Sequence, residues 1–123
     1  MGLRVAYIAG SVRSGSTLLD IAMGNHPGVQ SAGELHYLMH QRQQYGKCSC
    51  GEPVATCPLW GQVLGEWLRR TGEQDTCRYD ALRMSFERMR WIPRLLKERY
   101  AHSPEFRCYA KMTRVLLGTI QDI

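Results

Sequence analysis

The sequence predicts an α/β fold in which a parallel β-sheet lies between two layers of helices. Three consecutive features predict it: an apolar run at residues 3–9, a loop of small residues at 10–17, and a helical pattern at 18–23. A mostly apolar run without alternation suits a central parallel strand, which is buried on both faces. A strand, a short loop and a helix in this order form the first unit of such a fold.

The loop at residues 10–17 reads Gly10-Ser-Val-Arg-Ser-Gly-Ser-Thr17 and predicts an anion site. Such a loop turns backbone N–H groups and a helix N-terminus toward one point. The nucleotide-binding P-loop pattern, G-x-x-x-x-G-K-[ST], is matched at both glycines and at Thr17, but Ser16 stands at the lysine position. The cation of the loop is Arg13 instead. These residues predict a P-loop-like fold that holds an anion other than a nucleoside triphosphate.

A family resemblance covers residues 5–35. The stretch Arg13-Ser-Gly-Ser-Thr-Leu-Leu19, followed by His26-Pro27 and Gly33-Glu34, resembles the sulfotransferases that use 3′-phosphoadenosine 5′-phosphosulfate (PAPS). The similarity is greatest to the branch that includes tyrosylprotein, bacterial and carbohydrate sulfotransferases. Bacterial members also have a pattern similar to Cys48-Ser-Cys-Gly51 followed by Cys57-Pro-Leu-Trp60. The resemblance implies a PAPS-dependent transfer of the sulfuryl group to a hydroxyl acceptor, on a P-loop-like three-layer fold.

The resemblance implies that the loop wraps the 5′-phosphosulfate of the donor. We expect backbone N–H groups and hydroxyls of the loop to hold these oxygens, and Arg13 to stabilise charge on the leaving side. The expected donor-binding residues are Arg13, Ser14, Gly15, Ser16, Thr17 and Leu18. The alternative is a turn and helix cap without a ligand.

Glu34 is the expected general base, because the resemblance places a catalytic glutamate at this position in the tyrosylprotein branch. It would take the proton of the acceptor during attack. The alternative is a carboxylate that only fixes a loop or pairs with Arg13. Other branches use a histidine, which makes His36 the reserve candidate, whereas His26 is expected to be structural. The expected catalytic residues are therefore Arg13 and Glu34.

The rest of the sequence predicts helices around an irregular segment. The expected elements are a doubtful second strand at 29–32, helices at 35–43, 59–70, 79–100 and 105–118, and irregular structure over 45–58. Pro93 should interrupt the helix at 79–100. One convincing strand cannot form a sheet, so we expect residues 1–123 to be a single incomplete domain, the N-terminal part of a longer sulfotransferase. We expect this chain alone to be weakly active or inactive, because no motif for the 3′-phosphate is visible.

Five cysteines in a chain without a secretory signal predict free thiols in a reducing compartment. Cys48, Cys50 and Cys57 offer three ligands, whereas structural zinc normally has four. A fourth could come from His36, His40 or Cys77. Zinc, a labile disulfide and thiols of a substrate-side loop all stay open, and the spacing favours the thiols, so no metal is expected.

Composition is that of a globular protein, with 44% hydrophobic and 22% charged residues. No stretch approaches the ~20 apolar residues of a membrane span, and a cytoplasmic location is expected. The net charge of +5 suits an anionic donor, whereas the lack of interleaved aromatic residues argues against specific nucleic-acid binding. Two alternatives are a P-loop kinase or NTPase and a non-catalytic helical interaction module. The module would use a basic stripe at Arg83, Arg90, Arg94 and Lys97.

Overall fold

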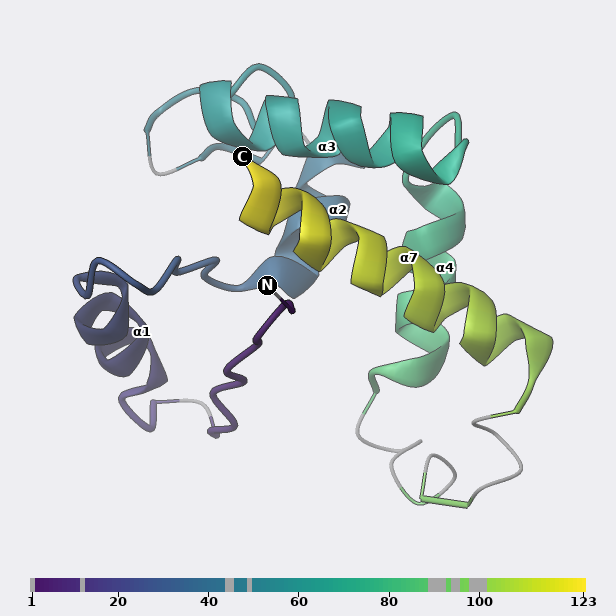
Figure 1. Cartoon of the computed structure of the whole chain (residues 1–123), viewed down its shortest axis with the longest axis horizontal. Coiled ribbons are helices and arrows are strands. Elements are labelled where there is room, and N and C mark those ends of the chain that lie inside the picture. Colours follow the sequence, from purple (N-terminus) through teal and green to yellow (C-terminus); the bar gives the residue numbers. More distant parts are fainter. Residues whose placement is uncertain are drawn as a thin grey trace. The chain divides into compact units, whose positions relative to one another are not determined.

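The computed structural model describes residues 2–11, 13–43, 46–48, 50–88, 93, 96–97 and 102–123. Its named elements are all helices (Figure 1): α1 (Ser16–Gly24), α2 (Leu35–Gln43), α3 (Pro58–Thr71), α4 (Cys77–Phe86) and α7 (Pro104–Asp122). The chain divides into two compact units, Met1–Leu35 and His36–Ile123. Whether residues 1–123 are one incomplete domain stays a prediction. None of the described helices is long and apolar enough to cross a membrane.

The predicted α/β fold with a parallel sheet is wrong for the described part of the chain. Its only β-pairing is one antiparallel bridge between Lys47 and Pro53. The expected strand at 3–9 has no strand structure, and its side chains are exposed apart from the half-buried Ile8, with Leu3 at 38% and Tyr7 at 88%. The expected strand at 29–32 is also absent. A parallel strand exists through hydrogen bonds to neighbouring strands, and the described residues supply no neighbour.

In the first unit, α1 forms where the sequence predicted a helix, and the chain then returns along it. Ser31 Oγ donates a hydrogen bond to Asp20 Oδ2 at 2.6 Å. A Cβ atom on Gly24 would lie 2.7 Å from the Ser31 Cβ, so Gly24 allows this close approach. A glycine three residues before Pro27 favours a left-handed cap at Gly24, but Gly24 is the last residue of α1 and the cap Asn25 is right-handed.

The second unit is built on α3 and α7, with α4 packed against α7 (Figure 1). The apolar face predicted for α3 is confirmed, since Val63, Leu64 and Trp67 have no exposed surface. Trp67 Nε1 donates to the Met112 carbonyl oxygen at 3.1 Å, which ties α3 to α7. Trp67 is therefore an anchor of the core of the second unit.

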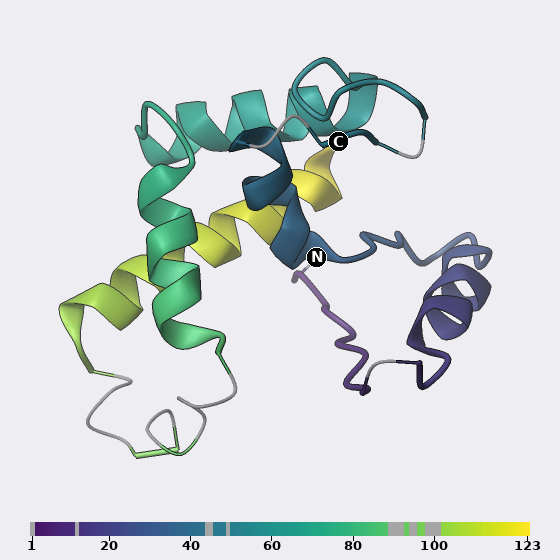
Figure 2. The ribbon, with the colours of Figure 1, turned by 180° about the vertical axis from the view of Figure 1, so that it is seen from behind.

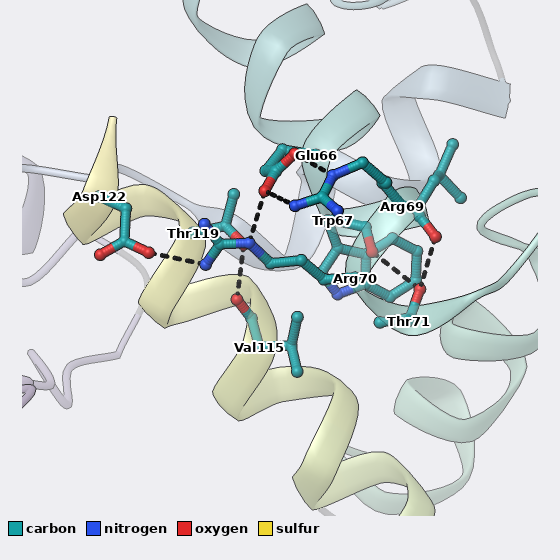
Figure 3. A network of polar contacts seen from close by, with 9 residues as sticks. Glu66, Trp67, Arg69, Arg70, Thr71, Val115, Thr119 and Asp122 are labelled. Atoms are coloured by element: carbon teal, nitrogen blue, oxygen red, sulfur yellow. Dashed lines mark hydrogen bonds and ion pairs between the residues drawn. The ribbon is translucent and has the colours of Figure 1, made fainter.

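A polar network joins the same two helices at the surface (Figure 3). Glu66 accepts hydrogen bonds from Arg69 and Arg70, with the Arg70 Nε to Glu66 Oε1 distance at 2.7 Å. Arg70 Nη1 also donates to Asp122 Oδ2 at 2.7 Å. These hydrogen bonds lower the pKa of Glu66 to about 2. Arg70 thus links α3 to the C-terminal end of α7.

The ends of the helices follow local sequence signals. Pro58 begins α3 and Gly72 ends it, while Ser103 Oγ accepts from the Phe106 N–H at the start of α7. The long helix expected over 79–100 is wrong, because α4 ends at Phe86 and residues 87–88 are not helical. The three- and four-residue spacing of apolar residues in that helix would place Leu96 on a buried stripe, but Leu96 is 80% exposed. Met89 and Tyr100, also expected there, lie outside the described residues.

The bounds expected for α2 are confirmed, and this helix is seen in front of α7 when the structure is viewed from behind (Figure 2). Its Leu38 and Met39 are buried. His40 Nδ1 of α2 lies 3.8 Å from Asp80 Oδ2 of α4. This contact accounts for His40 as part of the packing of the second unit.

Candidate functional site

The predicted anion loop is a tight turn that enters α1. The Ser14 N–H donates to the Ser11 carbonyl oxygen at 3.2 Å. Two residues of the loop adopt left-handed backbone conformations, Arg13 with φ 62° and Gly15 with φ 83°. For arginine this conformation is unusual. Consecutive N–H groups in such turns form concavities that bind anions.

No side-chain cap accepts hydrogen bonds from the first N–H groups of α1. Gly15 occupies the cap position and has no side chain that could accept a hydrogen bond. The first turn of α1 also holds no acidic residue. The helix ladder begins with the Leu19 N–H, which donates to the Gly15 carbonyl oxygen at 3.0 Å. The N–H groups before Leu19 therefore have no side-chain acceptor, and the helix dipole favours an anion beside them.

The structure places the expected donor-binding residues together around this helix N-terminus. Ser14 and Gly15 lie in the turn, and the next three residues form the first turn of α1. Their exposure is high: only Ser16 is half-buried, and the rest of the set is exposed. The set consists of Arg13, Ser14, Gly15, Ser16, Thr17 and Leu18. A bound anion could therefore reach their N–H groups from solvent without rearrangement of a core.

Arg13 and Glu34, the two expected catalytic residues, are both exposed in the first unit. The ion pairs among the described residues do not include one between them, so the alternative in which Glu34 pairs with Arg13 is wrong here. Glu34 follows Gly33, whose carbonyl oxygen accepts from the Leu35 N–H at 3.1 Å. Glu34 thus stands at the end of the segment that returns along α1, and no ion pair among the described residues includes its carboxylate.

Two histidines follow the predicted anion loop in the sequence, His26 expected as a structural residue and His36 as the reserve base. His26 Nδ1 accepts from the Gly28 N–H at 3.0 Å, which confirms its role in the turn after α1. His36, the reserve base, belongs to the second unit and packs on the Tyr37 ring at 3.9 Å. Like Glu34, it is exposed, so exposure does not separate the two candidates, and Glu34 stays the expected base on the resemblance alone.

Three cysteines of the second unit form a cluster, which we call the thiol cluster: Cys48, Cys50 and Cys57. Their sulfur atoms all lie within 4.8 Å of one another. The fourth ligands considered from sequence, His36, His40 and Cys77, are not part of this group. The Glu52 N–H acts to lower the pKa of Cys50, but the neighbouring Cys48 and Cys57 thiols and burial outweigh it and raise that pKa. Sequence spacing alone did not predict that the three sulfurs would meet.

A second cluster, not expected from sequence, lies between α4 and α7. Arg83 is only 8% exposed and pairs with Asp80 at 2.7 Å and with Glu87 at 3.4 Å. Tyr109 donates a hydrogen bond to Glu87, and burial together with this carboxylate raises the pKa of Tyr109 far above its usual range. The signal in the sequence was the spacing of Asp80, Arg83 and Glu87 by three and four residues.

The exposed basic stripe expected for an interaction module is therefore wrong at Arg83, whose charge is used inside the second unit. Arg90 and Arg94 lie outside the described residues, and Lys97 is exposed. The described residues consequently retain one of the four cations on which that alternative depended.

Comparisons with known proteins do not assign this chain to a family. No family model, no curated protein and no solved structure matches this chain.

Proposed function

We propose that this chain contributes the donor-phosphate loop of a PAPS-dependent sulfotransferase that acts on a hydroxyl acceptor. One observation carries the proposal: an arginine-containing turn with two left-handed residues leads into a helix N-terminus that has no side-chain cap. N–H groups and the dipole of this helix N-terminus favour a bound anion, and in the proposal the Arg13 guanidinium contacts the same anion. The residues that build it are those of the resemblance to sulfotransferases.

In the proposed reaction, the acceptor oxygen attacks the sulfur of PAPS in line with the bond to the 5′-phosphate. The new S–O bond forms as the bond between sulfur and the bridging oxygen breaks, and the electron pair leaves with adenosine 3′,5′-bisphosphate. Arg13 and the N–H groups of Ser14 to Leu18 stabilise the charge that develops on this leaving group. Their contribution is electrostatic and requires no metal ion.

Glu34 accepts the proton of the acceptor hydroxyl in this proposal. Its carboxylate is exposed and is therefore available to a substrate from solvent. The acceptor is a sugar, peptidyl tyrosine, lipid or small metabolite hydroxyl. The proposal places the reaction in the cytoplasm, because an odd number of cysteines suits a reducing compartment.

A P-loop kinase or NTPase is the competing enzyme class. Ser16 stands where the lysine of that class reaches the β- and γ-phosphates, so the loop lacks the charge that triphosphate binding uses. The helical interaction module is disfavoured by the internal ion pairs of Arg83. No observation on the described residues favours either over the sulfotransferase.

Calorimetric titration of the reduced chain with adenosine 3′,5′-bisphosphate, and in parallel with ATP–Mg²⁺, separates the two enzyme classes. The proposal predicts binding of the bisphosphate and weaker binding of ATP–Mg²⁺, in both cases reduced by salt. A preference for ATP–Mg²⁺ would contradict the proposal and support the kinase-like alternative. Heat signals of equal size for any polyanion, with no preference, would support the interaction module instead.

A further inference from the structure

The thiol cluster is created by a folded loop just before α3. The Gly51 N–H donates to the Cys48 carbonyl oxygen at 2.9 Å, which closes a tight turn. The Cys48 N–H donates to the Glu52 carbonyl oxygen at 2.8 Å, and the Val54 N–H to that of Gly46 at 3.0 Å. This short hairpin brings Cys48 and Cys50 back beside the start of the helix.

Cys57 joins them from the cap position of α3. Its N–H donates to the Pro53 carbonyl oxygen at 2.8 Å, and its own carbonyl oxygen accepts from the Gly61 N–H at 2.8 Å. Its side chain is 3% exposed, so its position is fixed by the core of the second unit. Cys57 thus holds one sulfur at the N-terminal end of α3.

The distances between the sulfur atoms fit a tetrahedral metal ion. Cys50 Sγ lies 3.7 Å from Cys57 Sγ. A Zn–S distance of about 2.3 Å gives an edge of about 3.8 Å between two sulfurs of a tetrahedron. All three sulfurs lie within 4.8 Å of one another, so small side-chain rotations would complete one face of that tetrahedron.

We propose that Cys48, Cys50 and Cys57 bind one Zn²⁺ ion, with a fourth coordination position open to solvent on the exposed side at Cys50. Each ligand loses its thiol proton to solvent as its sulfur coordinates the ion. Thiolate ligands in a tetrahedral arrangement select zinc over magnesium or calcium. The ion would tie the hairpin to α3 and would leave one position for water or another ligand. The site reverses the expectation from spacing alone, which favoured thiols without metal.

The test is a titration of the anaerobic, fully reduced chain with Zn²⁺ in competition with a chromogenic chelator, and with Co²⁺ as a spectroscopic probe. The proposal predicts one equivalent of either ion, with thiolate-to-cobalt charge-transfer bands and tetrahedral ligand-field bands. Cys50→Ser, at an exposed ligand, should weaken Zn²⁺ binding at least about 100-fold, beyond what loss of an outer-shell partner costs. The matched control is Cys77→Ser, also exposed, which should bind as the wild type does.

Circular dichroism of each variant establishes that it is folded, and Cys48→Ser provides a second ligand removal if Cys50→Ser is not. Failure of the reduced wild-type chain to bind one equivalent would overturn the site. Binding that survives both ligand substitutions, or that is lost in Cys77→Ser, would also overturn it. Formation of a Cys50–Cys57 disulfide without metal binding by the reduced chain would assign the cluster a redox role instead.

Discussion

Gly61 of α3 lies so close to Ala55 that a Cβ atom on Gly61 would come 2.8 Å from the Ala55 carbonyl oxygen. This contact sets the distance between the cysteine loop and the helix that follows it. A backbone oxygen cannot rotate away as a side chain can, so a methyl group at this position forces the loop to move. The close approach therefore couples the stability of α3 to the geometry of the thiol cluster.

We predict that Gly61→Ala destabilises the protein by about 1–3 kcal/mol, the usual cost of overpacking. Gly65→Ala is the matched control in the same helix, because a Cβ there meets nothing within 4 Å. It should stabilise the protein by about 0.5–1 kcal/mol through helix propensity. Urea denaturation followed by circular dichroism measures both. Equal effects of the two substitutions would show that the loop does not press on α3.

Trp67 should carry a large share of the stability of the second unit. We predict that Trp67→Phe costs about 2–4 kcal/mol, because it removes a fully buried ring edge and the hydrogen bond to the Met112 carbonyl oxygen. Trp60→Phe in the same helix is the control, since Trp60 is only half-buried. The same denaturation measurement applies, and a cost at Trp60 as large as that at Trp67 would contradict the assignment of the core.

Acid should destabilise the protein partly through Glu66. Its pKa is lowered to about 2 in the folded state by Arg69 and Arg70, against about 4.3 in an unfolded chain. A carboxyl group whose pKa is lower in the folded state than in the unfolded state stabilises the fold at pH values above its unfolded pKa. This stabilisation is lost as the pH falls through the folded pKa. Stability should therefore decline between about pH 5 and pH 2.

Glu66→Gln removes this titration, so we predict that it is less stable than the wild type at pH 7 and that the difference shrinks toward pH 2. Thermal unfolding across this pH range measures it. Glu52→Gln, at an exposed carboxylate of the same unit, should leave the pH dependence unchanged. A constant difference between Glu66→Gln and the wild type at all pH values would rule out Glu66 as the titrating group.

Glu34→Gln tests the proposed general base. In the complete sulfotransferase of which we expect this chain to be a part, it should lower the rate of sulfuryl transfer about 10²–10⁴-fold while binding of adenosine 3′,5′-bisphosphate is unchanged, because the base acts on the acceptor and not on the donor. Transfer of label from PAPS to a panel of hydroxyl acceptors measures the rate, and calorimetry measures binding of the bisphosphate. Unchanged turnover would remove Glu34 from the reaction, and loss of bisphosphate binding would make it a donor-site residue.

The sequence predicted those parts of the structure that depend on neighbours along the chain. The bounds of α2 were correct, and α3 was found to within one residue at each end, because its start and end follow from Pro58 and Gly72. The sheet was wrong because the run at residues 3–9 shows only that a strand is possible. Whether it pairs depends on strands elsewhere, and the described residues contain none.

The candidate sites also differ in whether they depend on neighbours along the chain or on distant residues. The anion loop is local, so its turn and the start of α1 were found where the sequence placed them. The thiol cluster depends on a turn at Gly51 and on the cap position of Cys57, and the spacing of the cysteines does not reveal either. The ion pairs of Arg83 could have been read from its helical spacing to Asp80 and Glu87, but its burial depends on α7.

The most direct test of the proposed function is the effect of Arg13→Ala on calorimetric binding of adenosine 3′,5′-bisphosphate. Charge-assisted hydrogen bonds contribute about 1.5–3 kcal/mol, so we predict at least about a tenfold loss of affinity with the fold intact. Arg13→Lys should recover part of it, and Arg4→Ala, at another exposed arginine of the first unit, should change little. Equal affinities of Arg13→Ala and the wild type would contradict the assignment of residues 10–17 as the donor-phosphate loop.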